Sequence, residues 1–215
     1  IELTSSATTM NRQQELSQLE QVATVLDQLG AQSVFVVADA EAYVATEAEA
    51  RLLAAMGSRV LALYTNNIYP PVEATVLAGV KTLREAQPDA VLAIGGGAAL
   101  ESAKVMNHIA SQIGDPASLI RRKAGPALPG RPLIAVPATA GSGAEATHYV
   151  LTHMQDGGMH LVKHAHMRPG YVVLDPSLTI SHQPLQVAVA GLGALALALE
   201  SIWNTQANEY SISYA

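Results

Sequence analysis

Short apolar runs alternate with longer segments in which apolar residues recur every three or four positions. The short runs, which predict buried strands, lie at 33–39, 59–65, 89–97, 132–137 and 171–176. The longer segments, which predict helices, lie at 11–30, 47–57, 72–88 and 98–112. Alternation of strand and helix is typical of a doubly wound parallel sheet. The sequence therefore predicts an α/β fold with a Rossmann-like parallel sheet.

From Pro184 the pattern changes to one long apolar helix that continues to Ala215. We therefore expect a dinucleotide-binding α/β domain at 1–183, and at 184–215 the first helix of a truncated all-helical domain. An apolar helix of this length needs neighbours. The sequence thus predicts either a homo-oligomer or a partner chain that covers the 184–215 helix.

Composition and charge narrow the class of protein. Hydrophobic residues make up 49% and aromatic residues only 4%, so the core must consist of Ala, Val, Leu and Ile. The net charge is −6 without any basic run, which argues against nucleic acid and anionic membranes as partners. The absence of cysteine excludes disulfides and thiolate chemistry.

Membrane insertion and secretion are not expected from this sequence. The longest apolar run, Val187 to Leu199, is shorter than the roughly 20 residues that a membrane helix needs. The first ten residues have neither a basic start nor an apolar core, and so do not look like a signal peptide. We therefore expect a cytoplasmic protein.

A glycine triplet, Gly95, Gly96 and Gly97, lies between a predicted buried strand and a predicted helix. Bare backbone N–H groups next to a helix N-terminus suit a phosphate group. The alternative is a plain tight turn between strand and helix. Lys104, further along the same helix, is expected to be an ordinary solvated residue.

A second glycine-rich stretch, 137–147, follows the next buried strand and carries Thr139, Ser142 and Thr147. Its hydroxyl groups could bind a ligand, although an ordinary polar surface turn would have the same composition. Because both loops follow strands of one parallel sheet, they should meet at its carboxyl edge, where α/β proteins bind ligands. Asp39, at the end of the first predicted strand, could bind an adenosine ribose and favour NAD over NADP.

Five of the seven histidines lie between His148 and His166. In a strand, His164 and His166 would point to the same side, which makes a metal site one possible interpretation. No Asp or Glu accompanies them at a metal-binding helical spacing, and the stretch 154–160 reads as a surface hairpin turn. Exposed hairpin histidines are therefore the favoured interpretation.

Four stretches together resemble the N-terminal half of iron-containing (group III) alcohol dehydrogenases: AIGGGAALESAK, PLIAVPATAGSGAEAT, VVLDPSLT and GLGALALALE. The stretches AEATHYV and KHAHMRPGYVVLDP look most like the phosphonoacetaldehyde reductase branch. The resemblance implies an NAD(P)-dependent oxidoreductase that acts on a small aldehyde or alcohol. It also implies a dinucleotide-binding α/β domain, a helical domain and a divalent metal in the cleft between them.

The resemblance also implies roles for particular residues in cofactor binding. Gly95, Gly96 and Gly97 would hold the pyrophosphate, and Ala98 would also bind the cofactor. Thr139 and Ser142 would lie along the cofactor, Lys163 near its ribose and nicotinamide, and Leu178 against its adenine, and Asp39 would select NAD. The chain departs from the family pattern at Ala98, Ala138 and Ala144, where the family has hydroxyl residues, and at Glu101, where it has Asp.

The largest departure concerns the metal. The first two metal ligands of the family, an Asp and a His four residues apart, are replaced here by Gly193 and Leu197, and its two further histidine ligands would lie beyond Ala215. The resemblance therefore implies that this chain holds no metal. A metal-free reductase would need a proton donor, for which Lys163 or His164 is the candidate. The alternative is a non-redox member of the fold: a pseudoenzyme, a repurposed pathway enzyme or one half of a split enzyme.

Overall fold

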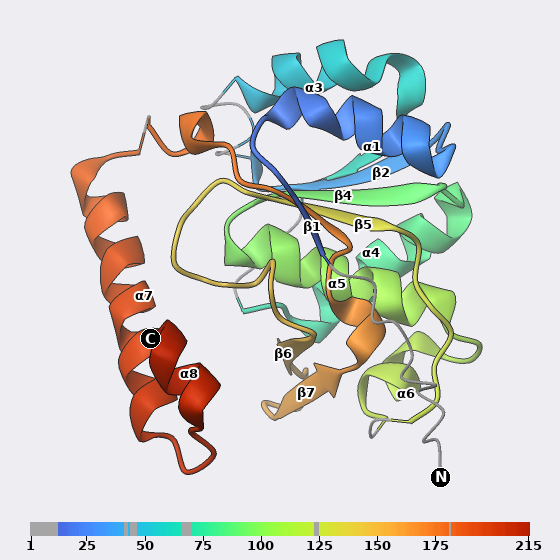
Figure 1. The fold of residues 1–215 in the computed structure, drawn as a ribbon. Coiled ribbons are helices and arrows are strands. Elements are labelled where there is room, and N and C mark those ends of the chain that lie inside the picture. The colour runs from blue at the N-terminus through green and yellow to red at the C-terminus, as the bar shows by residue number, and fades with distance from the viewer. Residues whose placement is uncertain (1–12, 41–42, 44–46, 66–69, 123–124, 181) are drawn as a thin grey trace, which may run out of the picture.

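The computed structural model describes residues 13–40, 43, 47–65, 70–122, 125–180 and 182–215. Its centre is a six-stranded sheet in which every neighbouring pair of strands is parallel. The strands are β1 (Gln14–Leu16), β2 (Val34–Ala38), β3 (Val60–Tyr64), β4 (Ala90–Gly95), β5 (Leu133–Pro137) and β8 (Tyr171–Val173). Their spatial order is β1-β8-β5-β4-β2-β3 (Figure 1). The predicted doubly wound α/β fold is confirmed.

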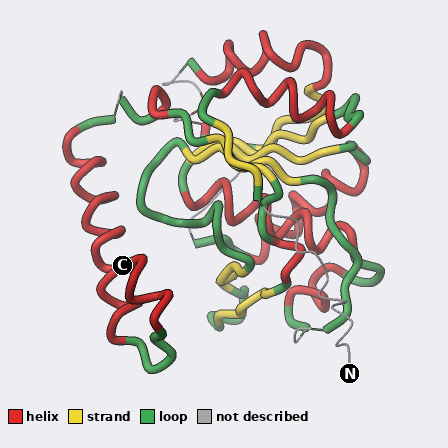
Figure 2. Tube along the Cα trace, in the orientation of Figure 1, coloured by secondary structure: helices red, strands yellow, loops and turns green. Residues whose placement is uncertain are grey.

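Helices cover both faces of the sheet, which lies between two helical layers (Figure 2). One layer holds α1 (Val22–Leu29) and α3 (Ala48–Met56), and the other holds α4 (Glu73–Ala86), α5 (Gly97–Ser111) and α6 (Pro116–Ile120). Every residue of β2 and β4 is buried. Both faces of these strands are covered, which is why they read as continuous aliphatic runs.

A small antiparallel hairpin stands apart from the main sheet. It consists of β6 (Tyr149–His153) and β7 (Met159–Lys163), with Tyr149 opposite Lys163. The predicted surface hairpin is therefore present. Among the described residues, the α/β part also contains four short 3₁₀ turns: η1 (Leu19–Gln21), η2 (Gly57–Arg59), η3 (Ala165–Met167) and η4 (Pro176–Leu178).

The predicted helix at 11–30 is wrong in its first half. Gln14–Leu16 form the edge strand β1, in which the Gln14 N–H donates to Gly170 O and Leu16 O accepts from the Leu174 N–H. The helix α1 begins only at Val22 and ends at Gly30, which has a positive φ of 65°. A strand of three residues is too short to show an alternating pattern, and its partner β8 lies far away in the sequence.

The helix predicted from Pro184 onward also ends earlier than expected. α7 (Pro184–Trp203) is followed by a turn, and Asn208 then caps the short helix α8 (Glu209–Tyr214). α8 folds back onto α7, where the Ser211 hydroxyl donates to Ser201 O at 3.2 Å. The turn residues Asn204 and Asn208 thus divide the predicted single helix.

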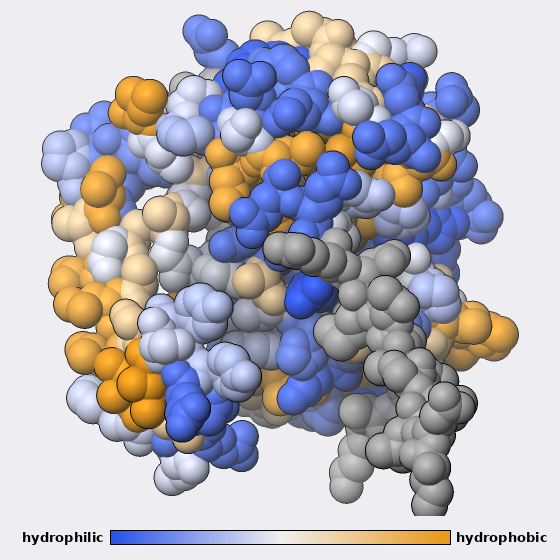
Figure 3. Space-filling model, viewed as in Figure 1, coloured by the Kyte–Doolittle hydropathy of each residue, from blue (hydrophilic) through white to orange (hydrophobic). Residues whose placement is uncertain are grey.

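α7 exposes most of its apolar side chains. None of its residues is buried, and Figure 3 shows hydrophobic side chains gathered over this end of the chain. By length and composition alone the helix could cross a membrane, contrary to the expectation drawn from its 13-residue core. A helix that normally packs inside a larger protein has the same properties, so this is weak evidence for a membrane span.

Candidate functional site

Three loops that carry the predicted ligand-binding residues meet at one edge of the sheet. Asp39 follows β2, the glycine triplet ends β4, and the 138–143 loop follows β5. These strands are adjacent, because β4 pairs with both β2 and β5. From β2 the chain passes outward to β3, whereas from β4 it passes the other way to β5. Such a reversal opens a crevice at the carboxyl ends of the strands.

The glycine triplet forms a turn that larger residues could not adopt without strain. Gly95 has a φ of +141°, and a Cβ atom placed on it would stand 2.5 Å from the Cβ of Asp39. A Cβ on Gly96 would stand 3.1 Å from the Thr139 hydroxyl oxygen. α5 then begins at Gly97. The three loops are thus packed closely together, with a helix N-terminus facing the crevice.

A cavity of about 910 Å³ opens over this turn and separates the sheet edge from α7. Its α/β side includes Asp39, Gly96, Gly97, Ala98, Glu101, Thr139, Ala140, Gly141, Ser142, Tyr149 and Leu151. α7 supplies Leu185, Gln186, Val189, Ala190, Gly193 and Leu197. The wall formed by α7 is thus apolar apart from Gln186, whereas the opposite wall offers hydroxyl, carboxylate and backbone groups.

Six of the predicted cofactor-binding residues line this cavity: Asp39, Gly96, Gly97, Ala98, Thr139 and Ser142. Gly95 lies directly beneath it, against Asp39. Leu178 does not reach the cavity. It is completely buried in the core beneath α1 and α3, so the structure does not support the adenine contact expected of it.

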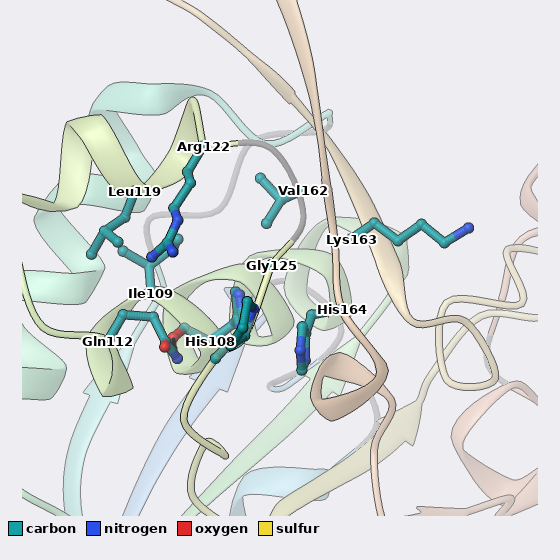
Figure 4. Close-up of a pocket in the computed structure, with 11 residues that line it drawn as sticks. His108, Ile109, Gln112, Leu119, Arg122, Gly125, Val162, Lys163 and His164 are labelled. Carbon is teal, nitrogen blue, oxygen red and sulfur yellow. Dashed lines mark hydrogen bonds between the residues drawn. The ribbon is translucent and has the colours of Figure 1, made fainter.

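The two predicted catalytic residues, Lys163 and His164, both border a small pocket of about 30 Å³, but their side chains point in different directions (Figure 4). Lys163 is opposite Tyr149, on the hairpin face that also carries the cavity-lining Leu151. Its exposed side chain points away from the small pocket drawn in Figure 4. Lys163 is therefore near the rim of the large cavity. The ring of His164, in contrast to the Lys163 side chain, lies at this small pocket and stacks on His108. The structure does not bring His164 to the crevice.

His164 belongs to a histidine cluster on α5 and η3. Its ring stacks on His108 with centroids 5.3 Å apart, and its Nδ1 accepts from the backbone N–H of His166 at 3.1 Å. Burial, reinforced by the neighbouring histidines, lowers the pKa of His108 to about 4. Within the part of the chain that the structure describes, no group of three or more His, Cys, Asp or Glu side chains could hold a metal ion.

The residues at the expected metal positions do not fit a metal. Gly193 and Leu197 lie four residues apart on α7 and both line the cavity, but neither side chain carries a donor atom. The expectation that this chain holds no metal rests on these residue types and stays a prediction.

Lys104, expected to be solvated, is buried instead, with an exposed fraction of only 1%. Its ammonium group donates to Ala144 O at 2.9 Å, to the Thr147 hydroxyl at 2.5 Å and to Tyr149 O at 3.0 Å. Lys104 lies one helical turn after Leu100, which is also buried, so the helical periodicity already placed it on the inner face. That signal was available in the sequence.

The fold and the site define a doubly wound α/β protein with a ligand site at the carboxyl edge of its sheet. Residues 13–176 match the model of the iron-containing alcohol dehydrogenases. The chain therefore belongs to the iron-containing alcohol dehydrogenase family. It is 31% identical to the probable alcohol dehydrogenase EutG of Escherichia coli over 191 residues, which are 86% of this chain and 47% of that protein.

Solved structures support the same fold. 1,3-Propanediol oxidoreductase superposes with a TM-score of 0.82 at 21% identity, over 92% of this chain and 53% of that one. Sulfoacetaldehyde reductase from Bifidobacterium kashiwanohense, determined in complex with NAD+, gives a TM-score of 0.79 at 24% identity, over 89% of this chain and 52% of that one. The present chain thus spans about half the length of these proteins.

Proposed function

We propose that this chain is the cofactor-binding part of an NAD-dependent alcohol dehydrogenase or aldehyde reductase that acts on a small aldehyde or alcohol. The observation that carries the proposal is the convergence of the glycine turn, Asp39 and the Thr139–Ser142 loop on one cavity. Membership of the family and the names of its relatives support the reaction class. NADP remains the alternative cofactor, and the phosphonoacetaldehyde reductase branch stays a prediction.

The residues of the crevice fit a dinucleotide. Gly96 and Gly97 line the cavity without side chains, so a pyrophosphate could approach the N-terminus of α5, where its negative charge is favoured. The carboxylate of Asp39, which lines the same cavity, would accept hydrogen bonds from an adenosine ribose. NAD supplies the hydride chemistry when bound. Lys163, on the hairpin face of Tyr149, would contact the ribose and nicotinamide side, as the family resemblance implies.

The apolar wall of the cavity favours a small substrate. Val189 and Leu197 of α7 face a cavity whose opposite wall carries Thr139 and Ser142. A substrate held there would be shielded from water on the α7 side and could form hydrogen bonds on the other. A lipid-embedded α7 could not line this cavity. We therefore propose that residues 184–215 begin a helical unit that packs over the crevice, and that the protein is cytoplasmic.

The apolar outer surface of α7 supports the expected partner. Leu192 and Trp203, which do not line the cavity, are 66% and 71% exposed. Burying such side chains is favourable by roughly 1.5–3 kcal/mol each. This free energy would be gained if further helical sequence, a second copy of the chain or a partner chain covered residues 184–215.

Titration of the protein with NADH, followed by fluorescence, tests the cofactor assignment. Wild type should bind NADH, and Gly96→Ala should bind it more weakly because the added Cβ presses on Thr139. Gly170→Ala is the matched control, since a Cβ there meets nothing within 4 Å. Absence of NADH and NADPH binding in wild type would refute the proposal.

A second measurement distinguishes catalysis from binding alone. NADH oxidation should be followed with a panel of short aldehydes, including phosphonoacetaldehyde. Oxidation of NADH with one of them would support the reductase. Binding of NADH without oxidation across the panel would favour the alternative of a non-catalytic member of the family.

A further inference from the structure

A buried lysine links two walls of the cavity through hydrogen bonds. Lys104 is 1% exposed and is among the largest fully buried side chains of the described residues. A lysine ammonium has three N–H donors, and Lys104 has three oxygen partners at 2.5 to 3.0 Å. The charge is thus fully hydrogen-bonded, which is the condition under which a protein tolerates a buried ammonium.

All three partners belong to one short segment that leads to the β6–β7 hairpin from the 138–143 loop. We call this loop, which carries Thr139 and Ser142, the hydroxyl loop. They are Ala144 O, Thr147 Oγ1 and Tyr149 O. The N–H of Ala144 in turn donates to the hydroxyl of Ser142 at 3.4 Å, and Tyr149 itself lines the cavity. The hydrogen bonds of Lys104 therefore end immediately next to Ser142 and at Tyr149, both of which are cavity residues.

The other end of the link is α5. This helix begins at Gly97, in the glycine turn, and contributes Gly97, Ala98 and Glu101 to the cavity. Lys104 follows Glu101 by one helical turn on the same helix. A side chain anchored on α5 thus holds the segment that continues the hydroxyl loop.

We infer that Lys104 is a positioning residue that fixes the Ser142–Tyr149 wall relative to the glycine turn and so keeps the cofactor site assembled. The part that concerns the cofactor rests on the proposed function. The part that concerns the loop rests only on the hydrogen bonds of Lys104.

Charged and titratable groups around Lys104 make this link sensitive to pH. Burial lowers its pKa to about 8, against the opposing effects of Glu101 on the same helix and Glu145 on the loop. His148, also on the loop, has its pKa lowered by burial and by Lys163 and Lys104. Above pH 8 the neutral amine keeps two N–H donors for three acceptors, so the loop should be held less firmly.

Amide hydrogen exchange of the protein without cofactor tests the positioning role directly. In Lys104→Met, exchange should become faster by about fivefold or more in the 139–149 segment, the change that follows from losing about one net hydrogen bond. In Lys81→Met, an exposed lysine of α4, it should not change. Unchanged protection of 139–149 in Lys104→Met would overturn the inference. If Lys104→Met does not fold, Thr147→Val removes one acceptor and should show a smaller change in the same segment.

The pH dependence of NADH affinity distinguishes a role of Lys104 in positioning the cofactor site from a role in the stability of the fold alone. Wild-type affinity should fall about fivefold between pH 7 and pH 9.5, whereas Lys104→Met should bind weakly and without this step. A step that persists in Lys104→Met would contradict the cofactor part of the inference. If wild type binds no NADH at any pH, the proposed function fails, and the amide-exchange result still decides whether Lys104 holds the loop.

Discussion

Gly141 lies directly against the backbone carbonyl of Ala190. The hydroxyl loop after β5 and the apolar helix α7 therefore touch, and a Cβ on Gly141 would overlap the Ala190 oxygen. Gly141 also has a φ of +98°, which side chains rarely adopt. This contact closes one side of the cavity, and it makes the position of α7 dependent on a residue without a side chain.

Substituting Gly141→Ala should therefore lower the free energy of unfolding by more than the backbone strain alone. Gly143→Ala provides the matched control, because Gly143 also has a positive φ, of +63°, but a Cβ there meets nothing within 4 Å. The strain of the positive φ should lower the unfolding free energy by roughly 1–2 kcal/mol in both variants. The overlap with Ala190 should add about 1–3 kcal/mol in Gly141→Ala. Denaturant unfolding measures both, and equal losses would contradict the contact.

Asp39 should determine the choice between NADH and NADPH. A carboxylate at this strand end favours a ribose hydroxyl and repels a 2′-phosphate. Asp39→Asn should therefore raise the affinity for NADPH relative to NADH by about tenfold, since a near charge–charge contact is worth about 1 kcal/mol or more. Fluorescence titration with both cofactors measures the ratio. Asp27→Asn, at an exposed residue of α1, should leave the ratio as in wild type.

The sequence was sufficient to predict how the central loops of the crevice are arranged. The strands β2, β4 and β5 are short and apolar, and Asp39, Gly95 and Thr139 lie at or just after their carboxyl ends, which the parallel fold brings to one edge. These features are local, so a pattern of a few residues reveals them.

Features that depend on distant contacts could not be predicted in the same way. β1 exists because Gln14 to Leu16 pair with β8, which lies far away in the sequence. Leu178 and His164 lie away from the cavity because η4 packs into the core and η3 turns toward His108. Lys104 is different, since helical periodicity placed it on the inner face, but its three oxygen partners come from another loop.

Lys163 and His164 are adjacent in sequence but should differ in function. Lys163→Ala removes a cation at the rim and should weaken NADH binding by about threefold to tenfold, as expected for a charge-assisted hydrogen bond. His164→Ala changes only the pocket shared with His108 and should leave both NADH affinity and turnover unchanged. Fluorescence titration and steady-state kinetics measure the two variants. Loss of turnover in His164→Ala with unchanged NADH affinity would restore His164 as a candidate proton donor.

Asp175 should make the stability of the fold sensitive to acid. Its carboxylate is 7% exposed and accepts from the Leu19 N–H at 3.0 Å, from the Ser177 hydroxyl at 2.6 Å and from Arg51 at 2.7 Å. Burial raises its pKa, but the hydrogen bonds from Ser177, Arg51 and Leu19 outweigh burial and hold the pKa at about 2. The ionised carboxylate therefore ties η1 and α3 to the segment after β8.

The direction of the pH effect follows from this lowered pKa. A carboxyl group with a lower pKa in the folded state stabilises the protein above its unfolded pKa of about 4, and this contribution is lost as the pH falls toward 2. The shift corresponds to about 2 kcal/mol. Asp175→Asn should lower the unfolding free energy at pH 7 by at least that amount and should flatten its decline between pH 4 and pH 2. Glu85→Gln, at an exposed residue of α4, is the control. Urea unfolding across this range measures both variants. If the unfolding free energy of Asp175→Asn declined between pH 4 and pH 2 as steeply as that of wild type, other carboxyl groups would be responsible for the acid sensitivity.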